Sequence, residues 1–301
     1  MHFNEDKAHC SAHTYWANGC PECKCAEDLA ESIRESRRMH KAAIRPLRVE
    51  IGANASPKTQ LIQQQLARVF GVFFARAKNK AAATAGKEAR KLQKADEIKK
   101  EDAEKIALLA WGAINWEELV NGVYLDLLAA AQVGIEESMS QLGAMPGSTQ
   151  KSLLELAEAY AKSRSVEMIG KQYINGKIYD DQAAKFVIAD TTRDDLVDIV
   201  ENVSTQQLTI DDLEKLIRTA KTFSDARAQL IATTETSMAQ VKLHVKSWKT
   251  FGVRKVNIEL SPTHPETDEC DDLAAGSPYE IDKCPFIPAH PHCQCTIVGI
   301  E

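Results

Sequence analysis

The stretch "RAQLIATTETSMAQVKLHVKSW", residues 227–248, decides the fold of this chain. Its apolar side chains recur every three or four positions, the spacing that places them on one face of an α-helix. Ser224 stands just before the stretch and is a preferred helix-capping residue. The pattern predicts a long helix that must pack its apolar face against other helices. That face comprises Ala228, Ile231, Met238, Val245 and Trp248.

Helical patterns also fill most of the chain before this stretch. Ser56 and Pro57 are a helix-start signal, and apolar residues follow from Leu61 to Phe73 at helical spacing. Thr209 caps a further short helix. Asn175-Gly176 is a turn signal that fits either a short hairpin or a loop between helices. The remaining helices are expected near residues 115–142, 150–170, 181–190 and 192–202.

The period changes only after Phe251. "VRKVNIEL", residues 253–260, alternates like a strand, and "CTIVGI", residues 295–300, is a short apolar strand. The predicted fold class is therefore mainly α: a helical bundle-like body with a small Cys/His-rich β unit at the C-terminus, about residues 251–301.

The segment "GAMPGS", residues 143–148, combines Gly and Pro and predicts a domain boundary. The expected domains are an N-terminal Cys/His cluster with a linker, a helical region with a basic helix, and a C-terminal domain. They span residues 1–50, 51–145 and 146–301, and the last of them ends in the β unit.

Bulk composition excludes several protein classes. The net charge of -6 gives no overall attraction to nucleic acid. No run of about 18 apolar residues predicts a membrane span, and the first residues have no apolar core of a signal peptide. We therefore expect synthesis in a reducing cytoplasm, where clustered cysteines bind metal more often than they form disulfides.

Residues 76–100 differ from the rest in charge. They hold nine basic and three acidic side chains among many alanines. One interpretation is a solvated helix that links two packed units. The other is a basic helix that lies near DNA phosphates or an acidic protein partner. No aromatic residue interrupts the segment, so base stacking is not expected.

The eight cysteines lie in two terminal clusters, with none between Cys25 and Cys270. In the C-terminal cluster, Cys293 and Cys295 are two residues apart and share a face on an extended strand. Together with Cys270 and one histidine they predict a structural zinc site, for which His290 is the preferred ligand and His264 the alternate. Zinc would replace a core that about 40 residues cannot build. The alternative is that these thiols only pack.

The N-terminal cluster has a compact four-ligand spacing, with two ligand pairs separated by six residues. It predicts a second small zinc module, a knuckle that binds nucleic acid or protein or only holds the terminus together. Its expected ligands are Cys10, His13, Cys20 and Cys23.

Glu235 falls on the apolar face of the helix over 227–248. A buried charge there is costly unless it is paired. We expect a structural ion pair with Arg227, Arg254 or another basic group, and a catalytic carboxylate is the weaker alternative.

Motifs of enzymes are missing from the sequence. There is no Gly-rich phosphate loop, no G-x-S-x-G and no Ser/His/Asp or Cys/His/Asn order. His264-Pro265-Glu266 matches half of the zinc deaminase signature, but Cys293-Gln294-Cys295 has the wrong spacing for the other half. No catalytic residues are therefore predicted.

Three segments resemble the phage head-morphogenesis family, the minor head proteins similar to protein F of phage Mu. "RAQLIATTETSMA", residues 227–239, resembles that family's R-A-x-x-I-A-x-T-E-T-x-x-A helix. "HPETDECDDLA" (264–274) and "HPHCQC" (290–295) resemble its H-P-x-x-x-D-x-C-D and H-P-x-C-x-C elements, in the same order. The resemblance spans roughly residues 153–301. Many members have a second Cys where this chain has Asp271 and Asp272.

The resemblance implies a low-copy virion protein in the head interior or at the portal vertex, made in the host cytoplasm during assembly. Its implied partners are the portal protein and capsid or scaffold proteins, with weak contact to packaged DNA as a further implication. Two alternatives stay open. One is a DNA-binding accessory protein that uses the basic helix and the N-terminal knuckle, and the other is a zinc-dependent enzyme or effector.

Overall fold

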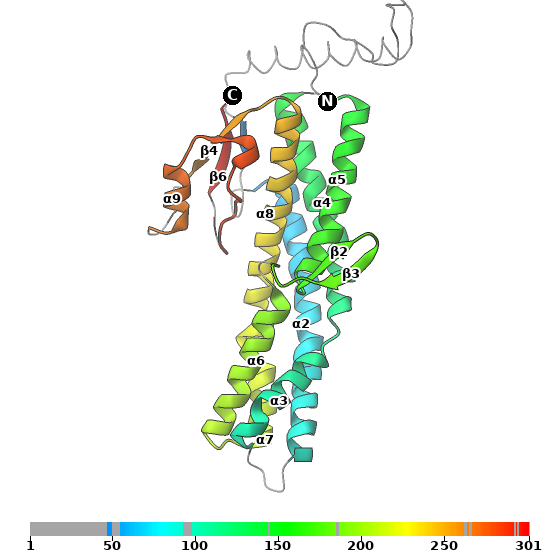
Figure 1. Ribbon diagram of the computed structural model, residues 1–301, viewed down its shortest axis with the longest axis vertical. Coiled ribbons are helices and arrows are strands. Elements are labelled where there is room, and N and C mark those ends of the chain that lie inside the picture. The colour runs from blue at the N-terminus through cyan, green and yellow to red at the C-terminus, as the bar shows by residue number, and fades with distance from the viewer. Residues whose placement is uncertain are drawn as a thin grey trace, which may run out of the picture.

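The chain is mainly helical, as predicted. In a computed structural model, an elongated helical bundle carries a small antiparallel sheet beside one end (Figure 1). The residues that the structure describes are 47–49, 55–92, 98–143, 145–184, 187–261, 264, 267–291, 293 and 295–300.

The body is built on long helices whose starts follow from the sequence. The helix predicted over 227–248 is α8, and the Ser224 hydroxyl caps it by accepting a hydrogen bond of 3.2 Å from the Arg227 backbone N–H. The Ser56 hydroxyl does the same for α2 by accepting from the Thr59 N–H at 3.3 Å. α8 packs against α4 and α2, and α4 also packs against α5 (Figure 1). The bounds are α2 Pro57–Leu92, α4 Trp116–Leu142, α5 Gly147–Glu167 and α8 Asp225–Thr250.

Shorter helices close the opposite end of the bundle. α3 (Lys100–Gly112) packs against α6 (Ile188–Thr205), and α7 (Ile210–Thr219) packs against the C-terminal part of α2. Thr209 forms the expected cap on α7, where its hydroxyl accepts a 3.1 Å hydrogen bond from the Asp212 N–H.

The turn at Asn175-Gly176 belongs to a hairpin, not to a loop between helices. β2 (Lys171–Ile174) pairs with β3 (Lys177–Asp180), and both turn residues have positive φ, 49° and 81°. Two consecutive positive φ values are what a two-residue hairpin turn requires, and Asn-Gly supplies them. The helix expected over residues 181–190 was wrong, since α6 begins only at Ile188.

The sheet of the C-terminal unit includes a strand that the sequence did not predict, β1, which comes from the N-terminal part of the described chain. The sheet order is β1-β6-β4-β5, antiparallel throughout, and it includes the two predicted strands β4 (Lys255–Glu259) and β6 (Thr296–Gly299). β1 (Leu47–Val49) pairs with β6, so residues far apart in the chain close one edge. The other elements of the unit are β5 (Tyr279–Glu280) and α9 (Glu269–Ala275).

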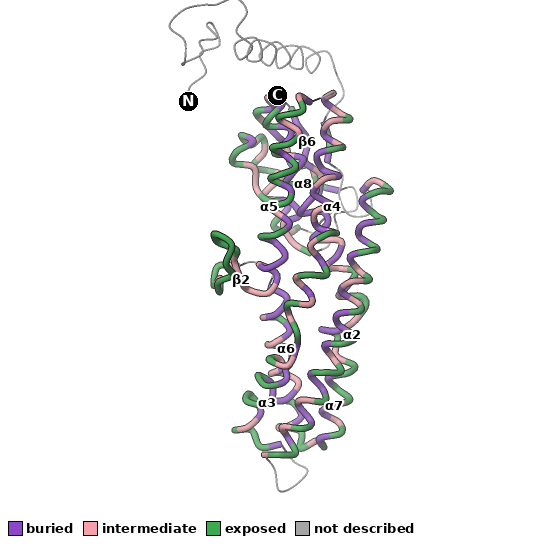
Figure 2. Tube along the Cα trace, turned by 90° about the vertical axis from the view of Figure 1, so that its right-hand side faces the viewer, coloured by how far each residue is buried: buried purple, intermediate pink, exposed green. Residues whose placement is uncertain are grey.

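Buried residues recur along the helices over the length of the bundle (Figure 2). Their apolar side chains form two clusters. One cluster, around Phe70, Phe74 and Leu213, fills the helical body. The other, around Trp248 and Ile297, joins α4, α5 and α8 to the sheet. Both draw residues from either side of 143–148, so in the described chain this segment is a turn between packed helices. The assignment of residues 146–301 to a head-morphogenesis domain stays a prediction.

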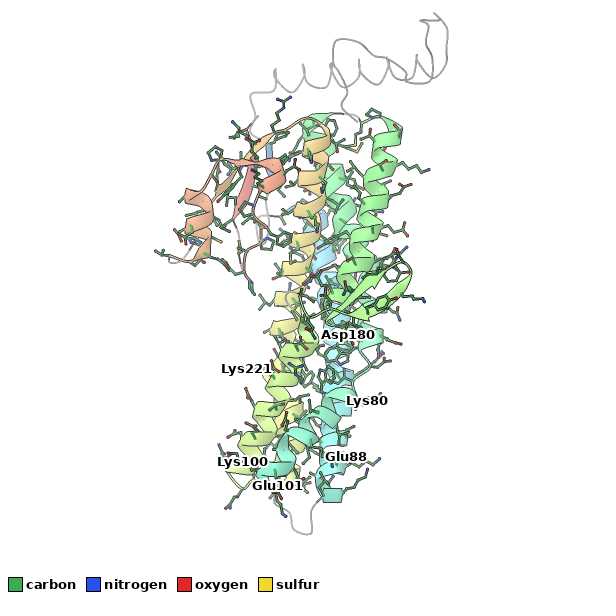
Figure 3. All side chains as sticks on the ribbon, viewed as in Figure 1. Lys80, Glu88, Lys100, Glu101, Asp180 and Lys221 are labelled. Carbon is green, nitrogen blue, oxygen red and sulfur yellow. The ribbon has the colours of Figure 1, made fainter. Side chains whose placement is uncertain are left out.

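The basic segment is not a solvated linker, which corrects that interpretation. Its residues 76–92 belong to α2, and five of their alanines are buried against the neighbouring helices: Ala77, Ala81, Ala82, Ala85 and Ala89. Small alanine side chains let helices approach closely, while the basic residues occupy the outer side. Lys80 is one of these and points away from the body (Figure 3).

α4 is long and apolar enough to cross a membrane by length and composition, with a mean hydropathy of 1.2 over its best window, 44% of which is buried in the molecule. It contacts α8 very closely at Gly134. A Cβ added there would lie 2.2 Å from the backbone carbonyl oxygen of Gln240 and 3.1 Å from the backbone nitrogen of His244. Only glycine permits this backbone approach, which places α4 in the core of the bundle.

Candidate metal centre

The turn before α9 places Cys270 inside the C-terminal unit. The Asp268 side chain accepts a 2.7 Å hydrogen bond from the Cys270 N–H, and Asp271 accepts one of 2.9 Å from the Asp268 N–H. These reciprocal bonds form a capping box that starts the short helix. As a result Cys270 is fully buried, while the two carboxylates stay at the surface of the turn.

Three of the predicted ligands meet at this point. The Cys270 Sγ lies 3.1 Å from the His290 Nε2 and 3.6 Å from the Cys293 Sγ. All three ligand atoms lie within 4.8 Å of one another. Since Zn–S and Zn–N bonds are about 2.3 and 2.0 Å long, tetrahedral zinc sets S–S and N–S separations of roughly 3.8 and 3.6 Å. The two printed separations from Cys270 thus differ from these values by about 0.5 Å or less.

Cys295 is the fourth predicted ligand and lies beside the trio. It is almost fully buried, and its thiol interacts with those of Cys270 and Cys293. It is not within 4.8 Å of all three ligand atoms at once. The two thiols of Cys293 and Cys295 therefore lie beside Cys270 on the stretch that leads into β6, and Cys295 is a candidate for the fourth ligand.

The hydrogen bonding of His290 leaves one ring nitrogen for a metal. Its Nδ1 lies 2.8 Å from the carbonyl oxygen of Pro291, so an N–H there donates to that carbonyl. Nε2 is then the ring nitrogen that faces Cys270, as a ligand atom must. Asp268 was not predicted, yet its Oδ2 lies 3.1 Å from the same Nε2. It is a second candidate for the fourth ligand, and its capping position was the available signal in the sequence.

His264 is not brought to the thiols in the described structure. Its Nε2 lies 2.9 Å from Asp271 Oδ2 and 3.5 Å from Asp268 Oδ1. These three side chains also gather within 4.8 Å. Because the two carboxylates already hold the capping box, ion pairing accounts for the group. The structure thus favours His290 over the alternate ligand His264.

Two of these thiols, those of Cys270 and Cys295, have raised pKa values, which favours their neutral form. Burial raises the pKa of Cys270, and the neighbouring thiol of Cys293 raises it further. The pKa of Cys295 is raised in the same way, first by burial and then by Cys293. A divalent cation reverses this preference because it stabilises thiolates directly. Buried and crowded thiols with a converging imidazole are a donor set that suits zinc.

Glu235 is buried, as predicted, but its partner is Arg164 and not Arg227. The Arg164 guanidinium donates to both carboxylate oxygens, from Nε at 2.8 Å and from Nη2 at 2.7 Å. Arg164 comes from α5 and is itself 2% exposed. Arg227 instead donates to Thr222 and lies over the Phe74 ring. The pair is a structural link between α5 and α8.

The N-terminal cluster of Cys10, His13, Cys20 and Cys23 lies outside the described residues. Comparison with protein-family models, with curated proteins and with solved structures finds no match to this chain.

Proposed function

We propose that this protein is a phage minor head protein that acts through protein contacts at the portal vertex or in the procapsid interior, and that a zinc ion holds its C-terminal unit. The observation that supports this is the meeting of two sequence elements. Cys270 comes from the first element that resembles the head-morphogenesis family, and His290 and Cys293 come from the second. The residues that carry the resemblance are thus also those that converge in space.

The role of the metal is structural in this proposal. Cys270, Cys293 and Cys295 are all less than 10% exposed, and three thiolates with one imidazole fill a tetrahedral zinc completely. Such a closed site leaves no position for the water that a catalytic zinc activates. Zinc here would fasten the turn before α9 to the strand β6. The protein would then assemble with its partners and would not catalyse a reaction.

Metal content tests the zinc part of the proposal. Purified protein should contain two zinc ions per chain by elemental analysis, one for each Cys/His cluster. Replacing Cys293 and Cys295 by Ser should lower this to one, whereas replacing the nearby Cys284, which faces the Pro285 carbonyl, should change nothing. Unchanged zinc content in the double variant would show that these cysteines only pack.

Co-assembly tests the phage part. The protein should be expressed together with the portal and capsid proteins encoded beside it, and procapsids should be separated by sedimentation. We expect the chain to travel with portal or procapsids in low copy. A chain that stays at the top of the gradient in every combination would contradict the proposal, whatever its metal content.

A DNA-binding accessory role is the second candidate, and one observation favours it. Lys80 and Lys87 lie exposed on the outer side of α2, while Arg90 pairs with Asp211 and Glu214 of α7. The Arg90 charge is therefore neutralised by ion pairs within the molecule, and only the exposed lysines remain for DNA. We propose weak DNA contact at most.

A further inference from the structure

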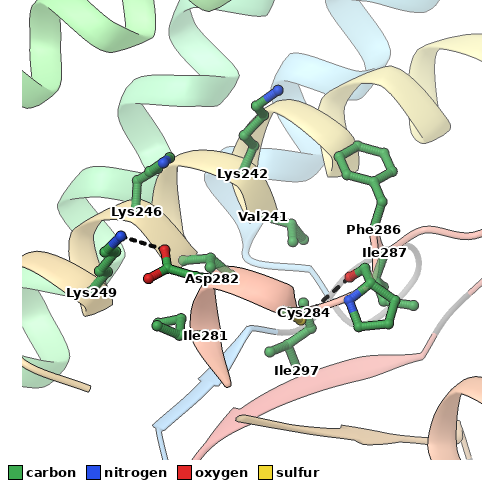
Figure 4. A pocket seen from close by; sticks show the side chains of 12 residues that line it. Val241, Lys242, Lys246, Lys249, Ile281, Asp282, Cys284, Phe286, Ile287 and Ile297 are labelled. Atoms are coloured by element: carbon green, nitrogen blue, oxygen red, sulfur yellow. Dashed lines mark hydrogen bonds and ion pairs between the residues drawn. The ribbon is translucent and has the colours of Figure 1, made fainter. Parts of the chain in front are cut away.

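An open apolar groove lies between α8 and the segment that leads to the metal centre (Figure 4). One wall is the face of α8 that carries Val241 and Val245, and the floor includes Ile297 of β6. The other wall is the segment 281–287, where Phe286 is 42% exposed. The exposed Phe286 ring and the apolar lining of the groove together form an apolar surface patch, and such patches mark binding sites for a further segment or partner.

The rim of the groove is basic. Lys242, Lys246 and Lys249 follow one another along α8 at helical spacing. Asp282 is the one acid among the lining residues, and it already pairs with Lys249. Lys242 lies over the Tyr160 ring, and no carboxylate of the described residues forms an ion pair with it. The groove therefore suits a segment with apolar anchors and acidic flanks.

The size of the groove favours a peptide segment over a cofactor. Its cavity volume is about 180 Å³, the room of about six water molecules. Drug-sized ligands and cofactors occupy about 300–1,000 Å³. One or two aliphatic side chains fit, and they would come from a helix lying across the opening.

The chain itself contains a segment of this chemistry. Residues 27–35, "EDLAESIRE", carry four acids and one arginine, and Leu29 and Ile33 are spaced to share one face of a helix. The segment lies outside the described residues. It joins the structure next to the groove, since β1 pairs Val49 with Ile297 of the groove floor. The 12 residues from 35 to 47 can span about 40 Å when extended.

We propose that residues 27–35 dock into this groove, with Leu29 and Ile33 against the apolar floor and the acids against Lys242 and Lys246. The contact would tie the N-terminal region, with its Cys/His cluster, to the metal-clipped unit. It is independent of the proposed function, because a docked segment requires neither portal protein nor DNA.

Hydrogen exchange of the full-length chain tests the docking. A tether of this length gives an effective concentration in the millimolar range, so a docked segment with a Kd of about 0.1 mM would exchange about tenfold more slowly than a free peptide of the same sequence. Replacing Lys242 and Lys246 by Glu should remove this protection. Lys151 and Lys215 are exposed and do not line the groove, so replacing them by Glu is the matched control and should preserve the protection.

A charge swap separates docking from general charge effects. Changing Glu27, Asp28 and Glu31 to Lys in the Lys242→Glu, Lys246→Glu background should restore slow exchange. Free-peptide exchange in the unmodified protein, or protection that persists in the Lys242→Glu, Lys246→Glu variant, would overturn the proposal. So would protection of the groove that arises only when portal protein is added, which would assign the groove to a partner.

Discussion

The helical body and the C-terminal unit differ in what fills their buried centres. The body buries a continuous apolar cluster in which alanines and phenylalanines of α2 pack against the other helices. The unit has short strands and a seven-residue helix, and its buried centre includes Cys270, Cys293 and Cys295. Long amphipathic helices stabilise the body by packing alone; the C-terminal unit lacks them, and in our proposal a zinc ion on its buried Cys/His cluster supplies the missing stability.

Removing the metal should give the largest effect and should act on one region only. Structural zinc sites contribute on the order of 10 kcal/mol to the folding of small units. With a chelator, we expect amides of β4 and β6 to lose hydrogen-exchange protection, while amides of α2 and α7 keep theirs. Equal protection with and without chelator would remove the contrast between the two regions.

Breaking the buried ion pair should give the next largest effect. Glu235→Leu strands the Arg164 guanidinium in the core and should cost about 3–5 kcal/mol in the free energy of unfolding. Glu235→Gln keeps the shape and some hydrogen bonds and should cost less. The double variant Glu235→Leu, Arg164→Leu removes both charges and should recover part of the loss. Denaturant titration measures all three, and equal costs for Leu and Gln would contradict the burial of the pair.

The buried histidine at the junction of the regions should make stability depend on pH. Burial lowers the pKa of His244 to about 3. Below pH 6.5 the His244 imidazole binds a proton in the unfolded chain but stays neutral in the native state. The free energy of unfolding therefore falls as pH decreases from 6.5 towards 3. The loss from this residue should reach about 2 kcal/mol at pH 5.

His244→Gln is the comparison for that measurement. Metal loss at low pH affects both proteins, so the difference between their pH profiles isolates the imidazole. Parallel profiles between pH 7 and 5 would mean that water reaches this side chain in the native state.

The smallest effect should come from the exposed charges of α2. Lys80→Glu with Lys87→Glu should leave the thermal midpoint close to that of the unmodified protein, because neither side chain contributes to the buried face. Any DNA binding at low salt should weaken in this variant and should also fall steeply as salt is raised. A large drop in stability would show that this outer side is packed.

Residues that act locally could be identified from the sequence. Ser56, Ser224 and Thr209 were recognised as caps, and each accepts the expected backbone hydrogen bond. Cys270, His290 and Cys293 are also predicted as ligands from the sequence, because their residue types suit zinc, and the structure brings these three together. Helix capping depends on neighbours a few positions away, and the ligand residue types are recognisable in the sequence itself, so both are readable without the tertiary structure.

Choices between distant partners were decided only by the tertiary structure. Periodicity showed that Glu235 is buried, but Arg164 became its partner because α5 packs beside α8. β1 was missed because three residues have no period of their own and gain a strand's hydrogen bonds only from β6. The role of Asp268 beside His290 likewise depends on a turn that folds back across 22 residues of sequence. A pattern in the sequence fixes which face of an element is buried, whereas the identity of the group that meets this face is set by how the elements pack.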